Sequence, residues 1–232
     1  FDHGTGKGGN IIDLVIKVEN ITLNGALEKL SQKNFDPFSF YQQKRKPGED
    51  QDTKTEIINI TSLTNKQLLD YIIERKISVI ISTIYLKEIT YRNSSSKTWK
   101  ALGFRNDKSG YEFRSKTFQG CTSKYFTTIT GISNMQLNIY EGFFDFLSAI
   151  ELSKKSIPKF NSLILNSVGM KEKTLDIIQK YDRLNLFLDN DAAGNIATKY
   201  FQTTHGNVVD YSKTIYPNNK DLNEYLMQKK KP

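Results

Sequence analysis

The stretch LNLFLDNDAAG at residues 184–194 decides how the second half of the chain folds. It begins with an apolar run that is typical of a buried strand, and a helical pattern follows from Ala192. Asp189 and Asp191 stand between the two, at the carboxyl end of the expected strand. Gly194 lies just inside the helix. The alternation of strand and helix seen here recurs in the rest of the second half of the chain.

The sequence around this stretch alternates between strand and helix patterns from Gly131 onward. Strands are expected at 137–140, 162–165, 184–188 and 208–211, and helices at 143–152, 171–180 and 192–203. Strands that alternate with helical stretches of about ten residues predict crossover connections and a parallel sheet, which is the α/β class. In such a sheet, ligands bind outside the carboxyl ends of the strands.

A third acid, Glu141, follows the strand at 137–140 directly. It should therefore meet Asp189 and Asp191 at one edge of the sheet. Converging carboxylates repel one another unless a cation lies among them, and a small set of hard oxygen ligands suits Mg²⁺. The alternative is that Asp at a strand-to-helix turn is an ordinary helix cap.

The positive charge of the chain is concentrated in one segment. The formal net charge is +8, and residues 91–125 carry 8 Lys and Arg against 2 Asp and Glu. Seven aromatic residues lie in the same segment: Tyr91, Trp99, Phe104, Tyr111, Phe113, Phe118 and Tyr125. This mixture is expected of a surface that binds phosphates and stacks on bases. It is equally expected of a basic β-sheet whose aromatic residues form its core.

The N-terminal half shows a different pattern of apolar and polar residues. Apolar residues spaced by three and four over 10–30 predict two short helices. Residues 34–60 are polar, charged and interrupted by Pro and Gly, so they are interpreted as a linker. Residues 61–89 favour helices, and short apolar runs alternate with turn signals over 89–118, as in hairpins. A small basic α+β subdomain is therefore expected at 61–131, before the α/β domain at 132–232.

Several classes of protein are excluded by composition. Cys121 is the only cysteine, so neither an intrachain disulfide nor a cysteine-rich zinc site can form from this chain. No apolar run approaches the roughly 20 residues that span a bilayer, and the first residues do not read as a signal peptide. We therefore expect a cytoplasmic protein with no membrane partner. The glycines at 4–9 fit a dinucleotide-binding pattern, but no strand precedes them, so we reject that reading.

Three segments resemble the TOPRIM domain, the magnesium-binding carboxylate module of primases and topoisomerases. Residues 139–145 (IYEGFFD) are similar to its first motif, and residues 186–194 (LFLDNDAAG) are similar to its second. Residues 220–226 (KDLNEYL) resemble the acidic segment that ends the module in bacterial primases. The segments occur in the family's order. The resemblance implies a Rossmann-like parallel sheet with flanking helices over 132–232.

The resemblance also implies which acids act. Glu141, Asp189 and Asp191 would be the catalytic residues, with Glu141 as the general acid or base. The same three, together with Asp221, would hold Mg²⁺ or Mn²⁺.

Three further residues of the two motifs are implied to support the site. Gly142 and Gly194 would let the backbone turn tightly and approach a phosphate. Asp145 would either support the site or cap the helix that follows, and we favour the structural role.

The preceding region resembles the catalytic core of bacterial-type DNA primases, of the mobile-element or phage type. Residues 69–77 are similar to a short helix of that core, and residues 101–105 and 110–116 to its basic hairpins. The implied nucleic-acid contacts are Arg105, Arg114, Lys116 and Lys124, and the alternative is that each is a solvated surface charge. Residues 6–13 resemble the tail of the zinc ribbon that precedes such a core, so 1–33 would be that tail. Its metal cysteines would lie upstream of Phe1 or be absent, and no zinc is expected here.

The reaction implied by the family is nucleotidyl transfer that makes short primers on single-stranded DNA. The implied partners are single-stranded DNA or an RNA/DNA hybrid, nucleoside triphosphates, and a helicase or mobilisation machinery. Two alternatives stay open at this point. The chain could be a TOPRIM nuclease, or a non-catalytic DNA-binding accessory protein of a mobile element.

Overall fold

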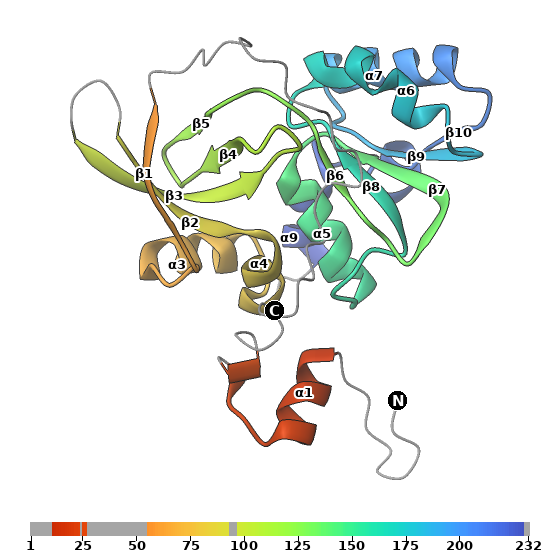
Figure 1. The fold of residues 1–232 in the computed structure, drawn as a ribbon. Helices are drawn as coiled ribbons and strands as arrows, with labels where there is room; N and C mark the ends of the chain where they lie inside the picture. The colour runs from red at the N-terminus through yellow and green to blue at the C-terminus, as the bar shows by residue number, and fades with distance from the viewer. Residues whose placement is uncertain (1–10, 24, 27–54, 93–96, 230–232) are drawn as a thin grey trace. The chain divides into compact units, whose positions relative to one another are not determined.

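The computed structural model describes residues 11–23, 25–26, 55–92 and 97–229 (Figure 1). The chain divides into two compact units, Phe1–Pro37 and Phe38–Pro232. In the first unit, α1 (Ile11–Glu19) confirms the first of the two helices expected there. The expectations for residues 27–54, which include most of the second helix and most of the linker, lie outside the described residues.

The second unit begins with a five-stranded antiparallel sheet in the order β1-β2-β3-β4-β5. Its strands are β1 (Glu56–Thr61), β2 (Lys87–Arg92), β3 (Thr98–Arg105), β4 (Tyr111–Arg114) and β5 (Gln119–Cys121). The consecutive pairing of β2 to β5 confirms the expected hairpins. Two predictions are wrong. Residues 56–60 belong to β1 rather than to a linker, and residues 87–89 belong to β2 rather than to a helix.

Two helices lie between β1 and β2 in the chain, α3 (Lys66–Glu74) and α4 (Val79–Tyr85). Each begins at a polar cap. The side chain of Asn65 accepts a hydrogen bond from the Leu68 N–H, and that of Ser78 accepts one from the Ile81 N–H. Such caps satisfy amide groups that have no partner inside the helix.

Most of the aromatic residues of the basic segment belong to the core. Tyr91, Phe104, Phe113 and Tyr125 are all less than 5% exposed. Tyr91 stacks on Phe113 with ring centroids 5.3 Å apart. Trp99, in contrast, is 44% exposed. The core interpretation is therefore confirmed for these four residues, and the alternative of an exposed base-stacking surface does not apply to them.

The second sheet has the order β10-β9-β7-β8-β6. Its strands are β6 (Thr127–Ile129), β7 (Ser133–Tyr140), β8 (Phe160–Ile164), β9 (Arg183–Phe187) and β10 (Val208–Asp210). All neighbours are parallel except β6, which pairs antiparallel with β8. The parallel α/β sheet is thus confirmed. Because β6 already belongs to it, the sheet begins before the boundary predicted between residues 131 and 132.

Helices cover both faces of the parallel sheet (Figure 1). One layer contains α5 (Phe143–Ser153) and α9 (Leu222–Lys229), and the other contains η1 (Val168–Thr174), α6 (Leu175–Ile178) and α7 (Ala192–Thr204). A short helix, α8 (Ser212–Ile215), follows β10. The apolar core under α5 and α9 also includes residues of α3, α4 and β3, so it joins the antiparallel sheet to the parallel one. Within the described ranges, no helix is long and apolar enough to cross a bilayer.

Candidate active site

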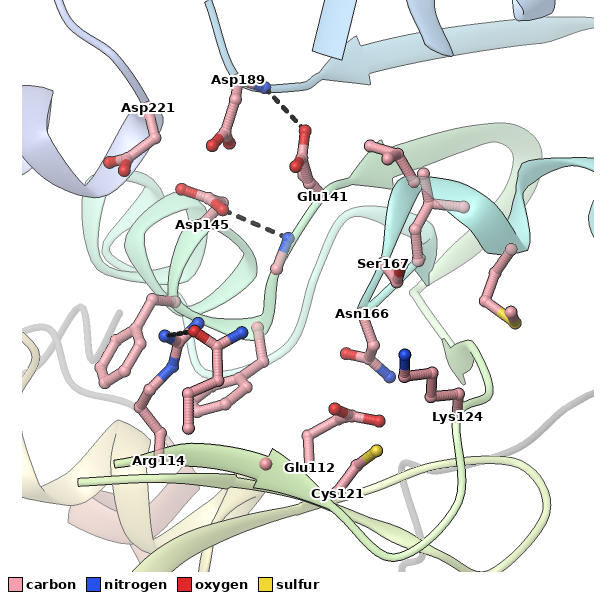
Figure 2. Close-up of a pocket in the computed structure, with 18 of the residues that line it drawn as sticks. Glu112, Arg114, Cys121, Lys124, Glu141, Asp145, Asn166, Ser167, Asp189 and Asp221 are labelled. Atoms are coloured by element: carbon pink, nitrogen blue, oxygen red, sulfur yellow. Dashed lines mark hydrogen bonds between the residues drawn. The ribbon is translucent and has the colours of Figure 1, made fainter. Parts of the chain in front are cut away.

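A cavity of about 870 Å³ lies where the carboxyl ends of the parallel strands face β4 and β5 (Figure 2). One wall is acidic and comes from the parallel sheet. Its acids are Glu141, Asp145, Asp189, Asp191 and Asp221. The facing wall comes from the antiparallel sheet and the loop after it, and its polar residues include Glu112, Arg114, Cys121 and Lys124. The fold therefore brings all five predicted acids to one cavity.

Glu141 and Asp189 are directly linked across neighbouring strands. Glu141 follows β7, and its Oε2 accepts a hydrogen bond of 3.3 Å from the backbone N–H of Asp189, beyond the end of β9. Burial, and then the negative charge of Asp189, raises the pKa of Glu141 to about 7. Burial, and then the charge of Asp221, raises the pKa of Asp189 to about 6. Both acids thus lie in a partly desolvated, negatively charged place, which favours binding of a cation.

Asp191 serves as a helix cap and faces the cavity at the same time. Its Oδ1 accepts hydrogen bonds from the N–H groups of Ala193 and Gly194, at 2.9 and 3.0 Å, and so caps α7. Its Oδ2 lies 3.8 Å from the Nζ of Lys220. The two interpretations of this acid drawn from sequence are therefore compatible, because each uses a different oxygen.

Asp145 is buried beneath the acidic wall. Its Oδ2 accepts a hydrogen bond of 3.3 Å from the Gly142 N–H at the start of α5. Its Oδ1 accepts one of 3.3 Å from the Asn223 N–H. Burial, and then the charges of Asp221 and Asp189, raises the pKa of Asp145. This acid caps its helix and ties α5 to α9, as the favoured structural role requires.

Asp221 occupies the cap position of α9. Its Oδ1 accepts a hydrogen bond of 2.7 Å from the Glu224 N–H. Its carboxyl group stands opposite Asp145 and Asp189 in Figure 2. The third acidic segment of the sequence therefore joins the first two at the cavity.

The two glycines of the motifs differ in how much space the surrounding backbone leaves for a side chain. A Cβ on Gly194 would lie 2.0 Å from the carbonyl oxygen of Asp189, so only glycine lets α7 pack on that turn. Gly142 has an extended backbone with φ of −128°, and a Cβ there would only meet the Asp145 carboxylate at 3.4 Å. The tight packing expected at both positions applies to Gly194 alone.

The acids do not yet converge on one point. Among the described residues, no group of three or more His, Cys, Asp or Glu side chains is arranged to hold a metal ion. Lys220 lies among them instead, with its Nζ 3.5 Å from Asp189 Oδ2. The donor set nevertheless fits Mg²⁺ in its chemistry, since it consists of carboxylate oxygens whose mutual repulsion a divalent cation would relieve.

The basic residues predicted to contact nucleic acid are divided by the fold. Arg114 and Lys124 line the cavity, and Arg114 donates a hydrogen bond to the Gln119 side chain. Lys116 is exposed and forms an ion pair with Glu74 at 3.0 Å. Arg105 is exposed at the end of β3 and does not line the cavity.

Four residues of the site carried no distinct signal in the sequence. Lys220 faces two acids, Asp189 and Asp191. Asn190 stabilises the loop that precedes Lys220, because its Nδ2 donates hydrogen bonds to the carbonyl oxygens of Tyr216 and Asn219. Glu112 and Asn166 line the other side of the cavity. Lys220 and Asn190 stood inside quoted motifs and Glu112 inside the segment 110–116, but none of them was singled out there. Tertiary packing places all four residues at the site, and residue spacing does not report it.

Comparisons with known proteins agree with this geometry. A family model described as Toprim-like matches residues 138–226, and one described as a domain of unknown function (DUF8464) matches residues 57–123. No curated protein sequence matches the chain. The primase fragment of the bacteriophage T7 primase-helicase protein is similar in structure, with a TM-score of 0.56, 17% identity, and coverage of 80% of each chain.

Two further solved structures are similar. One is a chain of the bacteriophage T7 lagging-strand DNA polymerase complex with primase domains bound to an RNA/DNA hybrid and dTTP. Its TM-score is 0.50 at 17% identity, over 67% of this chain and 83% of that chain. The other is the Aquifex aeolicus primase, with its zinc-binding and RNA polymerase domains. Its TM-score is 0.51 at 14% identity, over 97% of this chain and 68% of that chain. At these identities the likeness concerns the fold.

The parallel sheet with acids at its carboxyl edge and the Toprim-like match define residues 138–226 as a Toprim-like domain. Joined to the antiparallel sheet that precedes it, this domain gives the chain a fold similar to that of the primase structures.

Proposed function

We propose that this protein is a Mg²⁺-dependent nucleotidyltransferase that makes short primers on single-stranded DNA from nucleoside triphosphates. The observation that supports the proposal is the pairing of two walls in one cavity. Glu141, Asp189 and Asp191 lie on one side, and Arg114 and Lys124 lie on the other. A cation-binding wall and a phosphate-binding wall that face each other suit a reaction between two phosphate-bearing substrates.

The acids of the cavity would have separate tasks. Glu141, Asp189, Asp191 and Asp221 would hold Mg²⁺, which when bound neutralises the triphosphate and activates the attacking hydroxyl group. Glu141, whose pKa is raised to about 7, exists in both protonation states near neutral pH, as a general acid or base requires. Asp145, which caps α5, would keep that helix and the turn at Glu141 in place.

The basic residues would position the nucleic acid. Arg114 and Lys124 would bind phosphates of the template strand or of the hybrid product at the wall opposite the acids. Lys116 and Arg105 lie outside the cavity and would extend this contact along the surface. A helicase or mobilisation machinery remains a proposed partner. The RNA/DNA hybrid named for one similar structure fits the hybrid product proposed here.

The test is primer synthesis on single-stranded DNA with labelled ribonucleotides and Mg²⁺ or Mn²⁺, with nicking of a DNA duplex assayed in parallel. We expect labelled oligomers from the wild-type protein and none from Asp189→Asn, which removes a charge but keeps the shape of the side chain. A matched control is Asp182→Asn, which lies before β9 and outside the cavity. Nicking without synthesis would instead support a TOPRIM nuclease. Nucleic-acid binding with neither activity would support an accessory DNA-binding protein.

A further inference from the structure

The corner of the cavity opposite the acidic wall has its own polar groups. Glu112 on β4 and Asn166, in the loop after β8, both line it (Figure 2). In the close-up the carboxyl group of Glu112 points toward the Asn166 amide, and Lys124 and Cys121 lie beside them. None of the acids assigned to the metal belongs to this corner.

Both residues have a hydrogen-bond acceptor with no donor. Glu112 Oε1 and Asn166 Oδ1 are buried atoms for which no partner exists among the described residues. An unsatisfied buried polar group costs about 1–3 kcal/mol, so native proteins leave few of them. Two such acceptors in one corner of one cavity indicate that a donor-bearing ligand completes the corner.

The orientation of the Asn166 amide is fixed by its neighbours. Its Nδ2 donates to the carbonyl oxygen of Tyr125 at 2.9 Å and to Thr127 Oγ1 at 3.0 Å. Because a carbonyl oxygen can only accept, the NH₂ end must face Tyr125, and Oδ1 must face away from it. Asn166 also has a φ of 59°, in the left-handed region, where Asn is among the few residues tolerated. The fold thus holds this acceptor in a strained but defined position.

Glu112 is held in a place that disfavours its charge. Burial raises its pKa to about 8, although the Asn106 amide and the charges of Arg114 and Lys124 act in the opposite direction. The side chain has no ion pair within the described part of the chain. In its protonated form one oxygen carries the proton and the other accepts, and the broad, two-fold terminal torsion lets a small rotation present the accepting oxygen to a ligand.

We propose that Glu112 and Asn166 form a subsite that accepts hydrogen bonds from the 2′- and 3′-hydroxyl groups of a ribose. The inference rests on the proposed function, because it places the sugar of a nucleoside triphosphate whose phosphates face the acidic wall. Two neighbouring hydroxyl groups supply the two donors that the corner lacks, and acidic residues bind ribose hydroxyl groups in the same way in dinucleotide sites. A cavity of about 870 Å³ lies within the usual range for sites of small ligands.

The experiment compares ATP, 2′-deoxy-ATP and 3′-deoxy-ATP by calorimetric titration in the presence of Mg²⁺. We expect the wild-type protein to bind ATP about tenfold more tightly than either deoxy analogue, since each lost hydrogen bond leaves a buried acceptor unpaired. Glu112→Met removes one of the two acceptors with little change in shape and should bring the affinity ratio of ATP to one of the two deoxy analogues close to one. The matched control is Glu56→Met on exposed β1, which should keep the wild-type ratio.

Each outcome decides the inference. A wild-type ratio near one, a ratio unchanged in Glu112→Met, or no nucleotide binding at all would overturn it. If Glu112→Met does not fold, the wild-type ratios for the two deoxy analogues decide alone. The proposed function is tested separately, by primer synthesis. Primers made equally well from both sugars would keep the proposed function and remove the subsite, whereas sugar-selective binding without synthesis would do the reverse.

Discussion

The ammonium nitrogen of Lys220 lies 3.5 Å from Asp189 Oδ2 and 3.8 Å from Asp191 Oδ2, so one lysine faces both acids of the Asp-x-Asp motif. Its backbone is held in place as well, since the Lys220 carbonyl oxygen accepts a hydrogen bond of 2.6 Å from the Asn190 N–H. The charge of Asp189 is the main cause that raises the pKa of Lys220. The lysine therefore acts as the resident counter-ion of the acidic wall.

Removal of this counter-ion should strengthen the binding of a divalent cation. We expect Lys220→Ala to bind Mn²⁺ about two- to fivefold more tightly, because a half-exposed ion pair is worth roughly 0.5–1 kcal/mol and the metal no longer competes with it. Titration of Mn²⁺ followed by electron paramagnetic resonance measures the change. Lys199→Ala, on the exposed face of α7, is the control. Weaker binding in Lys220→Ala would show that the lysine organises the acids for the metal.

The two acids that share a hydrogen bond should respond differently to neutral substitution. Asp189→Asn should lose Mn²⁺ binding, yet gain on the order of 1 kcal/mol of unfolding free energy without metal, because burial and Asp221 already raise the pKa of Asp189. If Glu141 mainly handles a proton and is a secondary ligand, Glu141→Gln should retain most Mn²⁺ binding and lose roughly 10² to 10⁴ in rate, as expected when a general acid or base is removed. Equal loss of Mn²⁺ binding in both variants would identify Glu141 as a ligand first.

Glu112 should make stability depend on pH. Its pKa is about 8 in the folded protein, above the ordinary 4.5 of an unfolded chain, so its contribution is fully present below about 4.5 and is lost as pH rises through about 8. Glu112→Gln cannot titrate. We therefore expect the variant to gain stability relative to the wild type between pH 5 and pH 9, measured by urea unfolding at each pH. A constant difference across that window would contradict the raised pKa.

The glycines of the two motifs offer a matched pair of substitutions. Gly194→Ala places a Cβ 2.0 Å from the Asp189 carbonyl oxygen, and we expect a loss of roughly 1–3 kcal/mol in the free energy of unfolding from overpacking. Gly142→Ala meets only a carboxylate at 3.4 Å with an extended backbone, and we expect a change below about 1 kcal/mol. Similar losses in both variants, measured by thermal and urea unfolding, would contradict the assignment of close packing to Gly194 alone.

The parallel sheet and its acids could be predicted because the signal is local. The apolar runs before Glu141 and before Asp189 each mark a strand end, and parallel strands bring such ends to one edge whatever the rest of the chain does. The strand β1 was missed because it is an exposed edge strand. Ile58 and Ile60 are 46% and 41% exposed, and a bulge between Ile57 and Asn59 breaks the alternation on which strand prediction depends.

The facing wall could not be predicted, because it depends on how two sheets pack. Nothing in the spacing of the basic hairpins tells which of their side chains turn toward the acids. Arg114 does and Arg105 does not, although both end a strand of the same sheet. Glu112 shows the same limit, since an isolated acid in a basic segment reads as a surface charge until the opposite wall is present.

This division of the basic residues can be tested by the salt dependence of nucleic-acid binding. Arg114→Ala combined with Lys124→Ala removes two charges from the cavity wall, and Arg105→Ala combined with Lys116→Ala removes two charges outside it. Single strands release counter-ions with a slope of about 0.7 per neutralised phosphate. If the strand enters the cavity, the first pair should lower the slope of log affinity against log salt by about 1.4, whereas the second should leave it nearly unchanged. The Lys116 ammonium is already paired with Glu74, which favours this order.

Anisotropy of a labelled single-stranded oligonucleotide between 50 and 200 mM salt gives the slopes, and thermal unfolding checks that both variants fold. The opposite order would show that nucleic acid runs along the outer face of the hairpins and that the cavity wall serves only the nucleotide.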